Sequence, residues 1–120
     1  MTEQEHNAHV SPADAPYVAK VGGTVIARSD RAVILQEVSP RKTYPPVIYF
    51  PLEDVEQRHL LASDHHSFCP IKGDAGYYSL RTGGETLENA VWFYPDPLPM
   101  VAGVKGHVAF YPDRVTVEKV

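Results

Sequence analysis

The sequence predicts an all-β fold: a single compact domain of about seven or eight short antiparallel strands, barrel-like or in two packed sheets, with one short helix. Three observations support this fold class. The chain has 120 residues, the size of one domain. Its apolar runs are short, and turn residues separate them, among 11 prolines and 8 glycines. Closing or stacking the sheets would also protect the edges of so many short strands.

Composition and charge narrow the class of protein. The net charge of −4 leaves no basic footprint for nucleic acid, and no basic amphipathic segment suggests a membrane surface. The single cysteine excludes an intrachain disulfide and a multi-cysteine zinc site. No apolar run reaches the roughly 18 residues that could span a bilayer, and the acidic N-terminus is unlike a secretory signal. We therefore expect a cytoplasmic protein, without a cofactor, that contacts neither nucleic acid nor membrane.

The first elements follow from local patterns. Residues 1–16 are polar and are expected to form a flexible tail before a β domain over residues 17–120. The runs Thr24–Ser29 and Arg31–Val38 flank a tight turn and are predicted to pair as an antiparallel hairpin. A proline-rich loop then leads to a third strand over Val47–Phe50.

The short helix is expected over Pro51–Ser63, as one or two turns. Pro51 suits a first-turn position, and the acidic residues after it favour a helix N-terminus. A hairpin with a type II′ turn at Gly73-Asp74 should follow, then a strand over Asn89–Pro95 and a connection that contains a helical turn. A last hairpin, over Pro112-Asp113, is expected to close the chain.

The hairpin around Gly73 holds the only cysteine, Cys69. A type II′ turn places Cys69 opposite Tyr78 on the more apolar face, and Lys72 on the other face with Tyr77 unless Pro70 imposes a bulge. We expect Cys69 in the core, because free cysteine is among the most buried residue types. Catalysis by a Cys69 thiolate, with His66 or its neighbour His65 as base, is the alternative.

Five residues are candidates for binding a ligand: Lys72, Tyr77, Tyr78, Trp92 and Tyr94. A cation beside aromatic rings suits an anionic or flat ligand. Core packing and a solvated face would also account for these residues. Buried Tyr and Trp need partners for their polar ends, and Asp96, Tyr78 and Tyr49 are available. No metal site is predicted, because adjacent histidines diverge on a strand and zinc-ligand spacing is missing.

Four longer motifs carry a family resemblance. They are YFPLEDV (residues 49–55), SxxxSFCPIKGDAxYY (residues 63–78), ENAVWFYPDP (residues 88–97) and GHVAFYPDRVTVE (residues 106–118). Together they make the chain similar to the family called domain of unknown function 427. The resemblance implies a β-tent, a small all-β fold also seen in methionine sulfoxide reductase B and the ligand-binding domain of cereblon. Those relatives carry zinc on paired CxxC motifs, which the single cysteine here does not provide.

Three functions are compatible with the sequence. The first is a small-molecule-binding module whose pocket is lined by the aromatic residues and Lys72. The second is an enzyme that uses Cys69 with a nearby histidine. The third is an interaction or structural protein that forms a homo-oligomer through a sheet edge. The family resemblance supplies no catalytic residues that would decide among them.

Overall fold

The computed structural model describes residues 7–120. Its strands are β1 (Asn7–Pro12), β2 (Tyr17–Val21), β3 (Thr24–Ser29), β4 (Val33–Ser39), β5 (Lys42–Thr43), β6 (Val47–Pro51), β7 (Leu60–Cys69), β8 (Gly73–Thr82), β9 (Glu85–Phe93), β10 (His107–Phe110) and β11 (Thr116–Lys119). Three short 3₁₀ helices connect them: η1 (Leu52–Asp54), η2 (Gln57–His59) and η3 (Pro99–Val104). The predicted all-β class and the single domain are confirmed.

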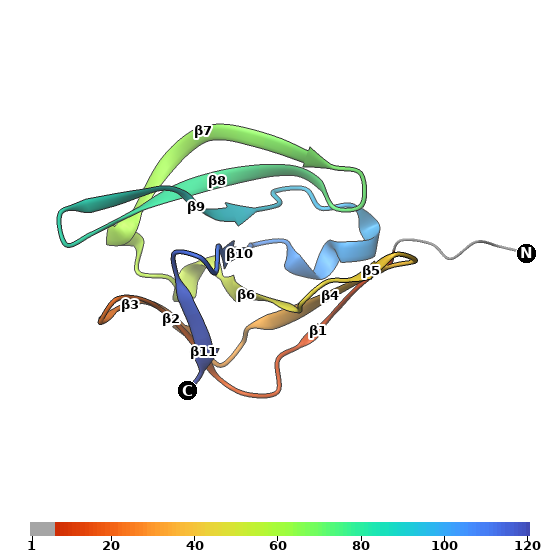
Figure 1. Ribbon diagram of the computed structural model, residues 1–120, viewed down its shortest axis with the longest axis horizontal. Coiled ribbons are helices and arrows are strands. Elements are labelled where there is room, and N and C mark those ends of the chain that lie inside the picture. Colours follow the sequence, from red (N-terminus) through yellow and green to blue (C-terminus); the bar gives the residue numbers. More distant parts are fainter. Residues whose placement is uncertain (1–6) are drawn as a thin grey trace, which may run out of the picture.

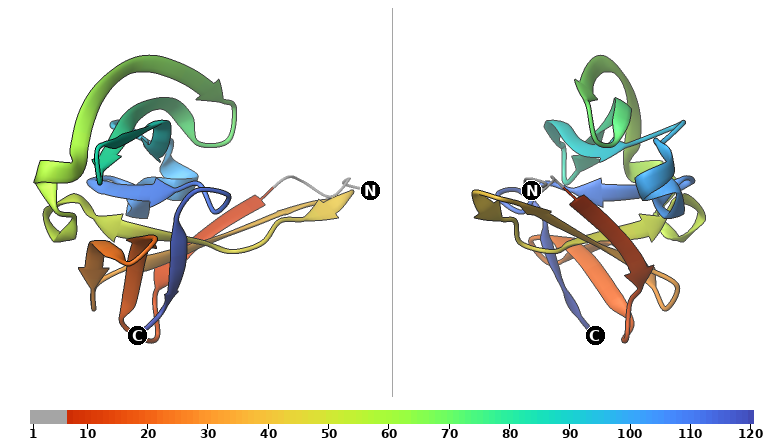
Figure 2. Two further views of the ribbon diagram at one scale, coloured as in Figure 1. Left: turned by 60° about the vertical axis from the view of Figure 1, so that its left-hand side comes forward. Right: turned by 90° about the vertical axis from the view of Figure 1, so that its right-hand side faces the viewer.

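The strands form two antiparallel sheets. The large sheet has the order β1-β4-β6-β10-β9-β8-β7, with β5 paired to β4, and the small sheet has the order β11-β2-β3. The large sheet bends sharply, so that β7, β8 and β9 form an upper layer above β6, β4 and β1 (Figure 1). Its two edge strands, β1 and β7, do not pair with each other, so the sheet is an open tent rather than a closed barrel (Figure 2).

Each face of the large sheet buries its own core. Side chains alternate along a strand, so the neighbours Tyr49 and Phe50 enter different cores. Phe50 packs with Val91, Val108 and Phe110 on the face covered by the small sheet. Tyr49 lies on the opposite face, which we call the inner face and which also carries Tyr77, Trp92 and Tyr94 of the upper layer. The helix η3 lies between the two layers of the bent sheet and fills part of this inner side (Figure 1).

The N-terminal prediction is corrected by β1. Residues Asn7–Pro12, expected in a flexible tail, pair with β4 over six residues. Their apolar positions explain this order, because Ala8 is buried and Val10 packs onto η3 at Gly103. The remaining part of the expected tail, residues 1–6, lies outside the described residues.

Two predicted hairpins are also wrong. The strands β3 and β4 are consecutive, but β3 pairs with β2 in the small sheet and β4 pairs with β1, β5 and β6 in the large one. Likewise β10 pairs with β6 and β9, whereas β11 pairs with β2. The turn residues between these strands therefore move the chain from one sheet to the other instead of closing a hairpin.

The expected helix over Pro51–Ser63 is only partly present. Two single 3₁₀ turns, η1 and η2, occupy its first part, and residues from Leu60 onward belong to β7. Val55 interrupts the helical path with an extended backbone and forms an isolated bridge with Ala27. The helical turn expected in the later connection is confirmed as η3.

Candidate functional site

The turn between β7 and β8 determines where Cys69 and Lys72 lie. The turn consists of residues 70–72, and Cys69 pairs with Gly73. The Lys72 N–H donates to the Cys69 carbonyl oxygen at 3.1 Å, and Gly73 closes the loop with a φ of 108°. The predicted type II′ turn at Gly73-Asp74 is therefore wrong, because a three-residue loop places the glycine after the turn rather than inside it. Tyr78 pairs with Ala62 instead of Cys69.

A buried ion pair crosses the inner side of the tent. Lys72 Nζ lies 2.6 Å from Glu37 Oε1, and the two side chains are 15% and 11% exposed. Lys72 belongs to the turn at the edge of the upper layer and Glu37 to β4 of the lower layer, with β6, β10 and β9 between β4 and β8 in the sheet order. The pair thus joins the two layers at their open side. We call it the Glu37–Lys72 bridge.

Sequence reasoning missed Glu37, although the strand pattern contains a signal. Val33, Leu35 and Glu37 alternate along β4, and Leu35 and Glu37 are both buried. A carboxylate on the buried side of an alternating strand is unusual and needs a cation or hydrogen-bond partners. From this pattern, Glu37 could have been predicted as the carboxylate partner of a lysine such as Lys72.

An aromatic cluster lies on the same inner side as this bridge. The Trp92 Nε1–H donates to the Tyr49 hydroxyl at 3.0 Å, and the two rings meet edge to face with centroids 6.2 Å apart. The Tyr111 ring lies against Trp92 at 4.5 Å. Tyr49 was one of the polar partners proposed for Trp92, and the structure confirms it. Tyr111 was not predicted as part of the cluster.

Two tyrosines on the inner side, Tyr49 and Tyr94, are buried, and Tyr111 is half-buried. Burial raises the pKa of Tyr49 and of Tyr94 well above the ordinary tyrosine value. Burial, followed by the neighbouring Tyr77 hydroxyl, raises the pKa of Tyr111 to about 12. All three side chains therefore stay neutral at physiological pH and can donate hydrogen bonds from their O–H groups.

Four of the five predicted ligand-binding residues lie on the inner side. Tyr77, Trp92 and Tyr94 belong to the inner-face core, and Lys72 reaches it through the Glu37–Lys72 bridge. Tyr78 does not, since it packs in the other core with its ring 5.0 Å from Phe93.

Cys69 and His66 are not brought together. Cys69 is a half-buried free thiol. Ser67, two residues earlier on the regularly paired end of β7, bonds through its hydroxyl to the inner-face Tyr77 hydroxyl at 2.7 Å, so Cys69 lies on the inner side like Lys72. The expected separation of Cys69 from Lys72 is thus wrong. Pairing is regular from His66 to Cys69, so these two side chains leave β7 on opposite sides. Cys69 was expected to be buried in the core, but its side chain is only half-buried.

An apolar cavity opens beside the bridge. It has a volume of about 520 Å³ and lies between residues 44–48 and residues 110–117. Its lining consists of Glu37, Tyr44, Pro45, Pro46, Val47, Ile48, Trp92, Phe110, Pro112, Val115, Thr116 and Val117. Glu37 and Trp92 join this cavity to the inner-face cluster, and we call it the Glu37–Trp92 cavity. Of the predicted ligand-binding residues, only Trp92 lines it.

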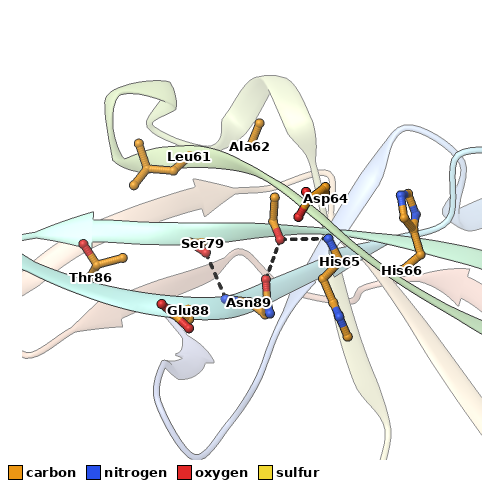
Figure 3. Close-up of a pocket in the computed structure, with 10 residues that line it drawn as sticks. Leu61, Ala62, Asp64, His65, His66, Ser79, Thr86, Glu88 and Asn89 are labelled. Carbon is orange, nitrogen blue, oxygen red and sulfur yellow. Dashed lines mark hydrogen bonds between the residues drawn. The ribbon is translucent and has the colours of Figure 1, made fainter.

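Two other cavities lie elsewhere. A cavity of about 250 Å³ is bounded by Tyr78, Tyr94 and His107, among mostly apolar neighbours. A larger one, of about 1020 Å³, lies over β7, β8 and β9 and is lined mainly by polar residues (Figure 3). His65 and His66 line this polar cavity.

The family model described as domain of unknown function (DUF427) matches residues 9–120. The chain belongs to this family. The match begins inside β1, so it includes residues 9–12 of this strand. A search among curated proteins finds no match. In residues 7–120 of this DUF427 domain, no three His, Cys, Asp or Glu side chains converge as metal ligands. Nor is any helix in the described chain long and apolar enough to cross a membrane.

Proposed function

We propose that this DUF427 domain binds a small organic molecule in the Glu37–Trp92 cavity. The observation that carries the proposal is a buried ion pair whose carboxylate partner, Glu37, lies at the wall of a mainly apolar cavity. Removing both charges of the Glu37–Lys72 bridge from water costs several kcal/mol per ion, so such a pair is a poor way to gain stability alone. A polar group fixed at the end of an apolar cavity is the usual arrangement for orienting a ligand.

The lining supports a flat, mainly apolar ligand that carries a hydrogen-bond donor. Prolines, valines and Phe110 form most of the wall, and a volume of about 520 Å³ suits a ligand of drug-like size. The Trp92 ring offers an aromatic surface, and the Glu37 carboxylate offers an acceptor. Among residues 7–120, no lysine or arginine lines the cavity, and Lys72 contacts Glu37 without lining it. A neutral or cationic ligand is thus favoured over the anionic one that Lys72 first suggested.

A fragment screen tests this proposal. The probes are flat heterocycles with an exocyclic amino group, measured by thermal shift and by the NMR signal of the Trp92 indole N–H. We expect binding fragments to raise the melting temperature and to shift this signal. Thr116→Phe places a ring at the exposed mouth of the cavity and should abolish both effects.

The matched control is Thr24→Phe, which makes the same change on β3 outside the cavity. Both variants should keep the melting temperature of the parent protein without fragment. Fragments that still bind to Thr116→Phe, or that shift only signals far from Trp92, would show that the cavity is not the binding site.

The other two functions have less support. Catalysis by Cys69 would require a base. His66 leaves β7 on the other side, and the ring of His65, the other candidate, packs against Tyr77. Formation of a homo-oligomer through the edges β1 or β7 stays a prediction, which light scattering can check.

A further inference from the structure

The polar cavity of about 1020 Å³ lies apart from the proposed binding site. It shares no lining residue with the Glu37–Trp92 cavity. Its lining consists of Leu61, Ala62, Ser63, Asp64, His65, His66, Ser79, Thr86, Glu88 and Asn89 (Figure 3). Irregular backbone builds it, so we call it the bulge cavity.

Two β-bulges face each other across β8. In β7, Asp64 and His65 are inserted between the pairs Ser63↔Tyr77 and His66↔Gly76. In β9, residues 88–90 stand opposite the single residue Ser79. Bulges interrupt the alternation of side chains and redirect them, and they occur frequently next to active and binding sites. Here they bring carboxylate, imidazole and amide groups from two separate strands to one place.

Hydrogen bonds from the side chains join the two bulges. The Ser63 hydroxyl donates to Asn89 Oδ1 at 2.6 Å and accepts from the His65 N–H at 3.1 Å. The Asn89 N–H donates to the Ser79 hydroxyl at 3.0 Å. The dashed lines in Figure 3 show these three bonds. The rim of the cavity is therefore one connected unit.

The backbone of the second bulge is held from another side by Arg114. Its guanidinium donates to the carbonyl oxygens of Glu88 at 2.5 Å and of Asn89 at 3.4 Å. Asn89 has a φ of 52°, a left-handed conformation that is uncommon outside glycine. Such a conformation persists where its surroundings over-determine it, and these positions cluster at functional sites.

The chemistry of the lining restricts the ligand. Hydroxyls, imidazoles and an amide outnumber the two carboxylates, Asp64 and Glu88, and no lysine or arginine of the described part of the chain lines the cavity. An anionic ligand is disfavoured by the two carboxylates. A metal ion is disfavoured because no three ligating side chains in residues 7–120 converge. His65 adds a flat ring, packed on the Tyr77 ring at 4.5 Å.

We propose that the bulge cavity binds a neutral polyhydroxylated molecule, such as a sugar ring. Neighbouring ligand hydroxyls can donate to the carboxylates of Asp64 and Glu88, which accept several hydrogen bonds each. The Asn89 amide supplies N–H donors, because its oxygen already accepts from Ser63. The His65 ring offers a surface for the C–H side of the sugar.

Titration by two-dimensional NMR tests the assignment. The probes are neutral mono- and disaccharides (glucose, galactose, mannose, N-acetylglucosamine, maltose and cellobiose), added up to tens of millimolar so that a Kd of about 1 mM is visible. We expect at least one saccharide to cause saturable shifts confined to residues 61–66, 79 and 86–89. Glu88→Gln and Asp64→Asn should each weaken that binding at least about tenfold, the effect of losing charge-assisted hydrogen bonds worth 1.4 kcal/mol or more.

The control Asp74→Asn makes the same chemical change on an exposed residue of the same hairpin, outside the cavity, and should leave binding unchanged. The proposal would be overturned if no saccharide caused a saturable shift, or if the saccharide shifts mapped to the Glu37–Trp92 cavity. Spermidine, a polycation, serves as a further probe. Shifts with spermidine and none with the saccharides would also overturn the proposal. Because the probes and the mapped residues differ from those of the fragment screen, either site can fail without the other.

Discussion

At Gly76 a missing side chain makes room for an aromatic ring. Gly76 lies directly opposite Phe93 in the β8–β9 ladder. A Cβ atom at position 76 would lie 2.6 Å from Phe93 Cζ and 3.1 Å from each Cε atom. The Phe93 ring cannot easily turn away, because it also packs against Tyr78. Glycine is therefore required here by a close contact and not by a turn.

Gly76→Ala should lower the free energy of unfolding by about 1–3 kcal/mol, the usual cost of overpacking a filled site. Urea unfolding measures this change. The control is Gly23→Ala, where no heavy atom lies within 4 Å of the added carbon, so the change should stay within about 0.5 kcal/mol. Adding Phe93→Leu should recover part of the loss. Equal effects of the two alanine substitutions would contradict the contact as the cause.

Single-residue chemistry was predictable from the sequence as a short set of candidate partners, among which the structure selects one. The Trp92 indole needed an acceptor, and Tyr49 provides it. The relation between Cys69 and Lys72 was not predictable, because it depends on the loop length of one hairpin. A different loop changes the register and moves side chains to the other face of a strand. Glycine with a positive φ fits both a type II′ turn and the end of a three-residue loop, so Gly73 did not distinguish them.

At the scale of the elements, the conformation of the paired bulges in β7 and β9 depends on particular side chains, above all on Asn89. Asn89 holds a left-handed backbone and accepts the Ser63 hydroxyl at the same time. These two roles can be separated, because glycine keeps the backbone conformation at little cost and alanine does not.

Asn89→Ala should cost roughly 2 kcal/mol of unfolding free energy, from a lost hydrogen bond and backbone strain together. Asn89→Gly should cost less, since it loses the hydrogen bond but adopts the positive φ readily. Thermal and urea unfolding of both variants measure the order. If glycine proved the more costly replacement, the left-handed conformation of residue 89 would not be a source of strain.

Most strands were predictable as elements, but their partners were not. Short apolar runs between turn residues mark β3, β4, β6 and β9 whichever sheet they join. The hairpins expected from β3 to β4 and from β10 to β11 fail because a turn of the same composition can close a hairpin or carry the chain to another sheet. Bulges were also missed, since inserted residues such as Asp64 and His65 look like ordinary members of a polar strand.

Across the whole molecule, the inner-face core is rich in buried tyrosine hydroxyls. Tyr49, Tyr94 and Tyr111 all have a pKa raised above the ordinary value of 10.0, with burial as the main cause. The folded protein keeps their protons in alkaline solution, whereas the unfolded chain releases them near pH 10. The stability they contribute is complete below pH 10 and is lost as the pH rises further.

The free energy of unfolding should therefore fall steeply above pH 10. Urea unfolding from neutral pH to about pH 11 measures this fall, beside tyrosinate absorbance of the folded protein. Tyr94→Phe removes one of the groups and should make the alkaline fall shallower. A fall of the same steepness in Tyr94→Phe would show that another group causes the alkaline loss of stability.

For the whole molecule, the sequence predicted the fold class but not the arrangement of the strands in the two sheets. Short punctuated strands indicated an all-β domain, and the four motifs indicated the family, which the match over residues 9–120 confirms. The division into sheets of different size, and the position of Asn7–Pro12 in the larger one, depend on pairings between distant segments. Local periodicity contains no information on such pairings. The same holds for the candidate site, whose Glu37 and Lys72 meet only in the folded chain.

The Glu37–Lys72 bridge also bears on how fast the protein opens. Its two residues are distant in the chain and belong to opposite layers of the bent sheet, so they can meet only after both layers have formed. Contacts between distant segments are made late, because the chain entropy of closing a long loop is lost first. An interaction formed after the folding barrier leaves the folding rate nearly unchanged and slows unfolding. Removal of one partner would leave the other charge buried without its ion-pair partner, and we therefore expect it to shorten the lifetime of the closed tent more than it slows its formation.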